Sequence, residues 1–571
     1  MMLPRLLVSL IVAGQGTLAA VHGPSSACNR TCKCLPQDSC WPRQDEWSRL
    51  NRTVGGRLVA TVPLGSPCHD PQYNEEACAA LRKDWLFPIV HIQSTSSVMA
   101  PLFANQSCEA FQPRSSPCTL GNYVKYAVDA EGPEDVAATL AFARKHNIRF
   151  VVRNTGHDFN GRSTGAGALA VRTHNLKGSR VLDWNDGHYT GKALRIGSGV
   201  LGYEAAQAAH RAGLVIVSGG CPSVGLAGGY IQGGGHSALS SVYGLAADNT
   251  LSFDVVLTSG RLVTASRSEN KDLYWALSGG GGGTYGIVVS VTIRAHPGAK
   301  VGGASFSIEA PQDNASRIYD VLDEFHAAVA RMADQGGFVF YSISKGSIHS
   351  QGLTFYNKTK AEVQAVIQPF LDSVSAGSRD LVVTSNFTEF PSYLEHYVHY
   401  VGPLPGGNLP VGTTLLGGRL IPRSVLPSLS PTVRQLVEMG VTFNGFGINV
   451  TRFGQDGANS VLPQWRDSIV SAVLMLPFDF DAPIGDMLEQ QNRITRDVQP
   501  VIEAATPGSG AYMNEGDFQQ RDFQSNFFGA NYPRLRAIKR RYDPEGMLYG
   551  VANVGSEDWV VGRDGRMCRS R

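Results

Sequence analysis

The sequence predicts an α+β protein built from two main parts, and three observations support this fold class. The chain has 571 residues, which is more than a single hydrophobic core accommodates. Between residues 119 and 298 short apolar strands alternate with helices and glycine-rich loops. Between residues 299 and 505 longer strands alternate with amphipathic helices. We therefore expect one α+β domain in the first range and an antiparallel sheet backed by helices in the second.

The composition is that of a globular protein with a modest surface charge. Hydrophobic residues make up 43% of the chain and charged residues 17%. The 50 Lys and Arg residues against 48 Asp and Glu residues leave a net charge of +2. Because no basic or acidic run stands out, we expect no nucleic-acid partner and no membrane partner. We expect a monomer that acts on a small molecule.

The N-terminus has the pattern of a secretory signal peptide over residues 1–20. Arg5 precedes the apolar run from Leu6 to Val12, and the small residues Ala19 and Ala20 follow. The apolar run is too short to cross a bilayer. The sequence therefore predicts secretion to the extracellular space.

Cysteine usage and glycosylation motifs agree with secretion. An even set of cysteines precedes residue 119, namely Cys28, Cys32, Cys34, Cys40, Cys68, Cys78, Cys108 and Cys118. Such a cluster in a secreted chain predicts a disulfide-stapled region at 21–118, with a zinc site as the less favoured alternative. Glycan acceptor motifs begin at Asn29, Asn51, Asn105, Asn314, Asn357, Asn386 and Asn449. Cys568 is left without an assigned partner, unless it pairs within the N-terminal set.

The α+β domain expected at 119–298 begins with a strand, a helix and a second strand, and a polar turn follows them. A strand at Tyr123–Val128 leads to a helix that begins at Pro133, and a second strand covers Ile148–Val152. Pro and two acidic residues in the first turn of that helix suit its dipole. The second strand delivers Arg153–Asp158, a glycine-bearing turn of the kind that presents backbone N–H groups to an anion.

Other expected elements follow along the chain. A hairpin turns at Ser259-Gly260, and a second glycine run covers Gly279–Gly283 before a strand at Gly286–Ile293. In the second part, strands are expected at Ala304–Ile308, Phe338–Ser344, Leu353–Tyr356, Thr413–Leu420 and Ile469–Met475, and helices at Arg317–Ala333, Lys360–Asp372 and Ile484–Ala504. The segment 506–571 is expected to return to the first part.

The stretch from Ser218 to Asn249 is unusually rich in glycine. It holds nine glycines and Cys221, the one cysteine between Cys118 and Cys568. Glycine at this density weakens helices and strands, so it indicates a close approach of the backbone to a ligand. A large phosphate-bearing cofactor is the natural candidate.

Three motifs together resemble those of a known flavoprotein class. They are RNTGHDFNGRSTG at 153–165, CPSVGLAGGYIQGGGHSALSSVYGLAADN at 221–249, and YMNEGDF at 512–518. In this order they resemble the vanillyl-alcohol oxidase and p-cresol methylhydroxylase class, in particular its berberine-bridge-enzyme-like branch in a secreted, fungal-type form. The resemblance covers about 119–298 and the C-terminal segment, and it implies the two-part FAD-binding domain of that class with a substrate domain.

The resemblance implies covalently bound FAD. His157 would bond the flavin 8α-methyl group and Cys221 the C6 position, because an imidazole nitrogen and a thiolate are the nucleophiles that suit an electrophilic flavin. The other expected cofactor-binding residues are Arg153, Asn154, Thr155, Gly156, Asp158, Ser163, Gly220, Val224, Gly225, Gly228, Gly229, Gly233, Gly234, His236, Leu245, Asp248, Ile287 and Asn514. We expect His236 to be structural or a neighbour of the flavin, and Asp248 to orient its own loop. No metal site is expected.

Two residues are candidates for the catalytic base. Tyr512 belongs to the Tyr-x-Asn segment that lies over the flavin in the class, and it would act if a nearby cation lowered its pKa. Glu515 is the second candidate.

The predicted reaction is a two-electron oxidation. Hydride would pass from a substrate C–H to the flavin, and O₂ would reoxidise the flavin to give hydrogen peroxide. Alcohols, saccharides and secondary metabolites all suit this chemistry. The alternative is a tailoring enzyme that catalyses oxidative cyclisation or desaturation. A carbohydrate-binding protein would not need His157 and Cys221. A nicotinamide enzyme would need a G-x-G-x-x-G turn that opens a helix early in a βαβ unit and is followed by an acidic residue, and we find no turn in that setting.

Overall fold

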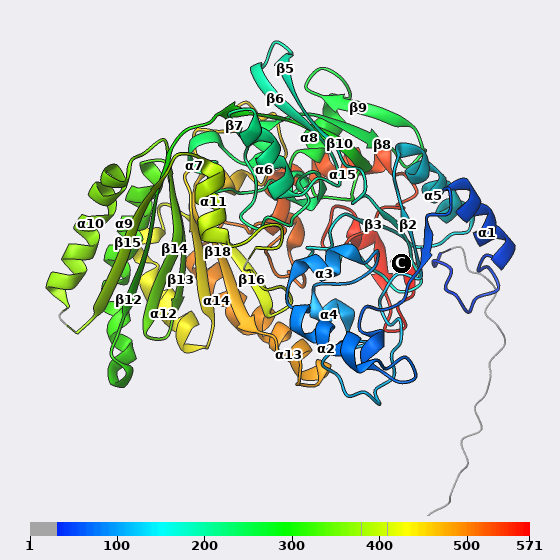
Figure 1. Cartoon of the computed structure of the whole chain (residues 1–571), viewed down its shortest axis with the longest axis horizontal. Helices are drawn as coiled ribbons and strands as arrows, with labels where there is room; N and C mark the ends of the chain where they lie inside the picture. The colour runs from blue at the N-terminus through cyan, green and yellow to red at the C-terminus, as the bar shows by residue number, and fades with distance from the viewer. Residues whose placement is uncertain (1–30, 379, 408, 571) are drawn as a thin grey trace, which may run out of the picture.

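The computed structural model describes residues 31–378, 380–407 and 409–570. Three sheets form the body of the molecule, with the largest at one end and the two smaller ones at the other (Figure 1). The predicted signal peptide, Cys28 and the motif at Asn29 lie outside the described residues. In the part of the chain that is described, no helix is both long and apolar enough to cross a membrane.

The smallest of the three sheets has four strands, and the expected polar turn follows one of them. Its strands lie in the order β1 (Leu58–Ala60), β2 (Tyr126–Asp129), β4 (Leu169–Arg172) and β3 (Phe150–Arg153). Strands β2, β3 and β4 are parallel, and β1 is an antiparallel edge. Helix α5 (Pro133–Lys145) packs Val136 and Leu140 onto Phe150, so the predicted strand, helix and strand are confirmed. Strand β3 ends where the turn begins.

The second sheet is antiparallel and five-stranded. Its strands lie in the order β5 (Ser179–Asn185), β6 (Thr190–Gly197), β10 (Ile287–Arg294), β8 (Thr250–Val256) and β9 (Leu262–Ser266). Val256 pairs with Leu262 across the turn, which confirms the predicted hairpin. Helices α6 (Gly202–Arg211) and α8 (Lys271–Leu277) contribute Ala205, Ala209, Leu273 and Leu277 to the core beside this sheet.

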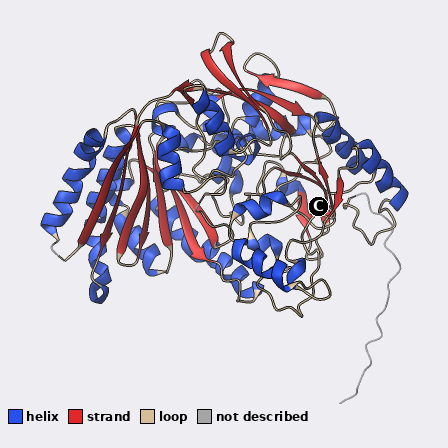
Figure 2. Ribbon diagram, viewed as in Figure 1, coloured by secondary structure: helices blue, strands red, loops and turns tan. Residues whose placement is uncertain are grey.

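The third sheet is antiparallel and seven-stranded. Its order is β15 (Val382–Phe390), β12 (Val301–Glu309), β14 (Ser347–Tyr356), β13 (Gly337–Ser344), β17 (Thr442–Gly447), β18 (Ser468–Pro477) and β16 (Thr414–Pro422). Helices cover one face (Figure 2), namely α9 (Leu322–Asp334), α10 (Lys360–Gly377), α12 (Ser430–Glu438), α13 (Ile484–Arg493) and α14 (Gln499–Ala505). The expected antiparallel sheet backed by helices is confirmed. Helix α11 (Tyr393–Val401) contacts both this sheet and α6.

The sequence reading missed two strands of this sheet. Strand β17 contains Asn444, Gly445 and Gly447, residue types that strands usually avoid. Strand β15 is an edge strand with mostly exposed side chains. Both are held by pairing with neighbouring strands, a contribution that local sequence does not report.

The two ends of the chain pack against the smaller sheets. Helix α1 (Gln44–Thr53) packs against α5, and three more short helices follow it, namely α2 (Glu75–Asp84), α3 (Pro88–Gln93) and α4 (Pro101–Ala104). At the other end, Lys539 of α15 (Tyr532–Tyr542) donates hydrogen bonds to the carbonyl oxygens of Thr284 (2.8 Å) and Leu548 (2.6 Å). Leu548 in turn forms an isolated parallel β-bridge with Phe150 of β3. The C-terminal segment thus joins the glycine run before β10 to the first sheet.

Disulfides staple the N-terminal region, and one of them reaches the C-terminal segment. Four are present among the described residues, namely Cys32–Cys568, Cys34–Cys40, Cys68–Cys78 and Cys108–Cys118. Cys568, which the sequence left without an assigned partner, pairs with Cys32 of the N-terminal set. Cys221 is a free thiol. The one cluster with metal-ligand geometry in the described chain is Cys34, Asp38 and Cys40, and both of its cysteines are disulfide-bonded.

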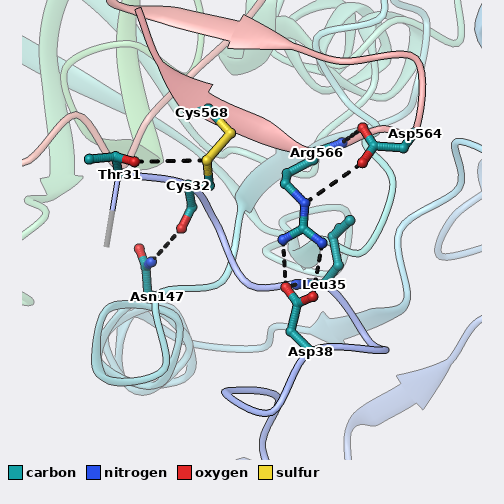
Figure 3. Close-up of a disulfide and its surroundings, with 8 residues drawn as sticks. All are labelled: Thr31, Cys32, Leu35, Asp38, Asn147, Asp564, Arg566 and Cys568. Atoms are coloured by element: carbon teal, nitrogen blue, oxygen red, sulfur yellow. Dashed lines mark hydrogen bonds and ion pairs between the residues drawn. A yellow bond between two sulfur atoms is a disulfide. The ribbon is translucent and has the colours of Figure 1, made fainter. Parts of the chain in front are cut away.

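The Cys32–Cys568 disulfide sits inside a larger contact between the two chain ends (Figure 3). Arg566 makes a bidentate ion pair with Asp38, with N–O distances of 2.6 and 2.8 Å. The Asn147 side chain donates to the Cys32 carbonyl oxygen at 2.8 Å. Cys568 belongs to the hairpin of β19 (Trp559–Val561) and β20 (Met567–Arg569). Sequence spacing could not reveal this pairing, because the two cysteines are 536 residues apart.

We predict that the Cys32→Ser/Cys568→Ser variant loses about 2–4 kcal/mol of unfolding free energy, since opening this long loop restores entropy to the unfolded chain. Chemical denaturation of the two proteins measures the difference. The matched control is Cys34→Ser/Cys40→Ser, which opens a separation of only 6 residues and should cost less. Equal losses in the two variants would contradict the loop argument.

Candidate active site

A cleft runs between the two smaller sheets and is closed on one side by the C-terminal segment. Its lining comes from five stretches of chain that are far apart in sequence. These residues are Phe150, Val152, Asn154, Thr155, Gly156, His157, Asp158, Phe159, Arg162, Ser163, Thr173, Val224, Gly225, Ala227, Gly228, Gly229, Tyr230, Gln232, Gly282, Gly283, Gly286, Val288, Tyr512, Asn514, Glu515, Leu548, Tyr549 and Asn553. The two glycine runs and the polar turn meet here, as the sequence predicted.

Glycines are required where the two runs cross. A Cβ atom on Gly282 would lie 2.9 Å from the Cα of Gly229, a contact with backbone that no side chain relieves. A Cβ atom on Gly225 would lie 2.1 Å from Oδ1 of Asn154. By contrast, a Cβ on Gly229 would meet nothing within 4 Å, because this glycine borders the open cleft. The wall is therefore bare backbone that a ligand could approach closely.

Most of the residues predicted to bind a cofactor line this cleft. They are Asn154, Thr155, Gly156, His157, Asp158, Ser163, Val224, Gly225, Gly228, Gly229 and Asn514, together with the two base candidates Tyr512 and Glu515. The carboxylate of Asp158 accepts hydrogen bonds from the backbone N–H groups of Asn160 (3.0 Å) and Ser163 (2.9 Å). Asp158 therefore fixes the shape of the turn.

The remaining predicted residues lie outside the lining, and the structure gives several of them another task. They are Arg153, Gly220, Cys221, Gly233, Gly234, His236, Leu245, Asp248 and Ile287. Asp248 pairs with Arg466 at 2.7 Å and accepts the Leu245 N–H at 2.8 Å. Through these contacts Asp248 holds the backbone of its own loop. Ile287 is buried in the core beneath the first sheet.

His157 and Cys221 come together at the edge of the cleft. Their Nε2 and Sγ atoms are 4.0 Å apart. The Ser223 hydroxyl lies between them, 2.8 Å from Nε2 and 3.4 Å from Sγ. Burial and the nearby Arg153 guanidinium lower the pKa of His157 to about 4, so its imidazole is neutral near pH 7. Burial raises the pKa of Cys221.

Arg153 is a buried cation next to His157. Its guanidinium donates to the carbonyl oxygens of Ser97 and His91, so the N-terminal helices are tied to the end of β3. Burial, with a smaller effect of the Arg172 cation, lowers the pKa of Arg153 to about 9. Arg153 therefore contributes positive charge behind the turn without entering the cleft.

Tyr512, Asn514 and Arg162 form a hydrogen-bonded row along the cleft. Asn514 Nδ2 donates to the Tyr512 hydroxyl at 2.8 Å, and Arg162 Nη1 lies 3.4 Å from Asn514 Oδ1. Burial, followed by the nearby Glu515 carboxylate, raises the pKa of Tyr512, and the Arg162 cation opposes this only weakly. The sequence prediction required a nearby cation that lowers the pKa of Tyr512. In the structure the pKa of Tyr512 is raised instead.

Glu515 and His236 form a pair beside Tyr512. His236 Nε2 lies 3.0 Å from Oε1 and 3.2 Å from Oε2 of the carboxylate. The His236 ring is buried against Phe446, with ring centroids 4.7 Å apart. Glu515 lines the cleft, whereas His236 supports it from behind. His236 was expected to be structural or a neighbour of the cofactor, and its visible partner is this carboxylate.

The sequence reading missed several lining residues that lay within its own motifs or next to them. Arg162 is inside the first motif, and Gly282 and Gly283 belong to the second glycine run. Tyr549 and Asn553 come from the returning C-terminal segment. Nothing in the local pattern around Tyr549 and Asn553 indicates a ligand, because only the folding of the C-terminus brings them to the cleft.

The cleft suits a large polar cofactor. Four buried polar atoms of its lining residues have no hydrogen-bond partner in the described chain, namely Asn154 Oδ1, Gln232 Oε1, Asn553 Oδ1 and Arg162 Nη2. Leaving such atoms unpaired costs free energy, so they indicate groups that a ligand satisfies. Together with the bare glycine wall and the nucleophiles His157 and Cys221, they fit a flavin nucleotide.

Comparison with known proteins agrees with this assignment. The family model described as FAD binding domain matches residues 124–266, and the one described as berberine and berberine like matches residues 511–554. The FAD-linked oxidoreductase ZEB1 of Gibberella zeae is 48% identical over 555 residues, which cover 97% of each chain. The bifunctional decalin synthase calF of Penicillium decumbens is 36% identical over 566 residues, 97% of this chain and 98% of that one.

A solved structure shows the same fold. The VAO-type flavoprotein MtVAO615 of Myceliophthora thermophila matches with a TM-score of 0.90 and 38% identity, over 94% of this chain and 100% of that one. The expected fold class and cofactor, FAD, are therefore confirmed. The chain belongs to the FAD-linked oxidoreductases of the vanillyl-alcohol oxidase and berberine-bridge-enzyme-like family.

Proposed function

We propose that this protein is a secreted oxidase in which FAD, bonded to His157 and Cys221, accepts hydride from a substrate C–H and passes the electrons to O₂, giving hydrogen peroxide. The contact of both nucleophiles with one serine hydroxyl, at the edge of the glycine-walled cleft, is the observation that carries the proposal. The four disulfides among the described residues support an oxidising compartment.

The chain's own groups hold and orient the cofactor. The cleft offers bare backbone at Gly228, Gly229 and Gly282 and amide oxygens at Gln232 and Asn553. The Arg162 guanidinium adds a positive charge to a largely neutral lining. Tyr549 and Leu548 border the cleft from the C-terminal segment.

We propose Glu515 as the group that takes the substrate proton. Its carboxylate lines the cleft, and the His236 imidazole holds it at 3.0 Å. Tyr512 is less suited to this role, because burial and Glu515 raise its pKa. Tyr512 instead accepts the Asn514 hydrogen bond and fixes that side of the cleft.

The substrate is an alcohol, a saccharide or a secondary metabolite. The alternative function, a tailoring enzyme for oxidative cyclisation or desaturation, gains support from one relative. That relative, 36% identical, is a decalin synthase by name, and this name assigns a ring-forming reaction to a protein of the same family. The proposed residues serve either reaction, since both begin with removal of a proton and a hydride.

We expect the purified protein to show flavin absorbance and to produce hydrogen peroxide in a screen of alcohols, oligosaccharides and aromatic metabolites. Oxygen consumption equal to product formed would support the oxidase. A product with a new ring, identified by NMR, would select the tailoring enzyme. Substrate turnover with an added electron acceptor but without any uptake of O₂ would contradict the oxidase.

The covalent bonds are tested by removing each nucleophile. We predict that His157→Ala and Cys221→Ala each keep flavin on the denatured, acid-precipitated protein, because one bond remains in each. Only the double variant should release all flavin into the supernatant. Release of all flavin from the wild-type protein would contradict covalent attachment.

The base assignment is tested by two matched variants. We predict that Glu515→Gln lowers kcat about 10²- to 10⁴-fold, the range expected for loss of a general base, with little loss of bound flavin. Tyr512→Phe, which keeps the buried ring but loses the hydroxyl, should have a much smaller effect. A larger loss in Tyr512→Phe than in Glu515→Gln, measured by steady-state kinetics, would assign the proton to Tyr512.

A further inference from the structure

Ser223 is placed to act on both nucleophiles at once. It is fully buried, and its hydroxyl lies 2.8 Å from His157 Nε2 and 3.4 Å from Cys221 Sγ. The two nucleophiles themselves are 4.0 Å apart, too far for a strong direct hydrogen bond. Among the hydrogen bonds of the described chain, Ser223 is the one side chain that links them.

A hydroxyl donates one hydrogen bond and accepts others, so it can satisfy two different partners. When Nε2–H of His157 donates to Ser223 Oγ, the hydroxyl proton is free to point at Cys221 Sγ. This arrangement leaves the lone pair on Nδ1 of His157, and Nδ1 makes no hydrogen bond to any residue that the structure describes. It also gives a thiolate at Cys221 a hydrogen-bond donor. Both groups are then nucleophiles.

The electrostatic surroundings show why the hydroxyl matters more for the thiol. The His157 imidazole is neutral without help, because burial and Arg153 lower its pKa to about 4. Burial raises the pKa of Cys221, and the Ser223 hydroxyl leads the groups that lower it, followed by the backbone N–H groups of Ser223 and Val224. Removing the hydroxyl therefore leaves less thiolate at neutral pH.

We infer that Ser223 is a positioning residue for both flavin attachments: it selects Nδ1 of His157 as the bonding nitrogen and stabilises the thiolate of Cys221. This inference rests on the covalent attachment proposed above. Each bond replaces one hydrogen of the side chain and one of the flavin, at the 8α-methyl group or at C6. The two electrons and two protons released with each bond reduce one O₂ to hydrogen peroxide.

Other ionisable groups near the pair keep one charge state through neutral pH. Arg153 stays cationic below about pH 9, and the buried His91 beside it has a pKa of about 4. Tyr397, which donates to the Gly220 carbonyl oxygen at 3.0 Å, has its pKa raised well above the usual value by burial. A pH dependence of bond formation between about pH 6 and pH 8 therefore reports the Cys221 thiol.

The test compares Ser223→Ala with the wild-type protein and with Ser218→Ala as a control. Ser218 is buried three residues before Cys221 in the same loop, and its hydroxyl has no partner in the described chain. Mass spectrometry of proteolytic peptides measures the fraction of Cys221 bonded to flavin and identifies the bonded nitrogen of His157. Purified Ser223→Ala protein is then incubated in air at about pH 6 to about pH 8, and the Cys221 bond is followed with time.

We expect Ser223→Ala to form the Cys221 bond about 10- to 100-fold more slowly at pH 7, since a hydrogen bond to a charged group is lost. The rate should rise with pH, because the thiolate fraction rises as pH approaches a raised pKa. The His157 bond should form but divide between the two nitrogens. Ser218→Ala and the wild type should carry both bonds, with Nδ1 alone attached.

Two results would overturn the inference. One is a Ser223→Ala protein with both bonds, the same nitrogen and no pH dependence. The other is attachment through Nε2 in the wild type, a measurement that needs no variant. A wild-type protein without any covalent flavin would instead refute the proposed attachment itself, so the two failures are distinguishable.

Discussion

The close approach of two backbone segments, at Gly229 and Gly282, is the constraint on which the site depends. A Cβ atom on Gly282 would lie 2.9 Å from the Gly229 Cα, so no other residue type fits there without moving a sheet connection. The absence of side chains leaves a wall of peptide groups beside an open cleft. Such a wall binds a ligand through backbone N–H and C=O groups, which suits a nucleotide better than an apolar molecule.

The reactive side chains come from segments that the fold holds in fixed positions around the cleft. His157 follows the end of β3, and Cys221 and Ser223 follow β7 (Leu214–Val215), which pairs with β11 (His296–Pro297). Glu515 comes from the C-terminal segment, which the buried Lys539–Asp543 ion pair (2.6 Å) helps to anchor. The nucleophiles therefore sit on loops that begin at strands β3 and β7, while the proposed base comes from a separate segment of the cleft lining.

The sequence predicted the parts whose signal is local. Helix α5 begins with Pro133 and two acidic residues, which favour the start of a helix. The glycine runs and the Arg153–Asp158 turn indicate a cofactor site by their composition. Pairings between residues far apart in the chain could not be predicted from local sequence. The Cys32–Cys568 disulfide and the pairing of strand β17 with β13 are examples. The base candidate changed for a related reason: the burial that raises the Tyr512 pKa comes from the assembled fold and leaves no trace in the local sequence.

We propose that FAD occupies the glycine-walled cleft and is bonded there by two side chains. A crystal structure of the purified yellow protein is the decisive test. We predict flavin density in this cleft, continuous with the side chains of His157 and Cys221 and next to the Glu515 carboxylate. Flavin density at another site, or density in the cleft that is separate from both side chains, would contradict the claim.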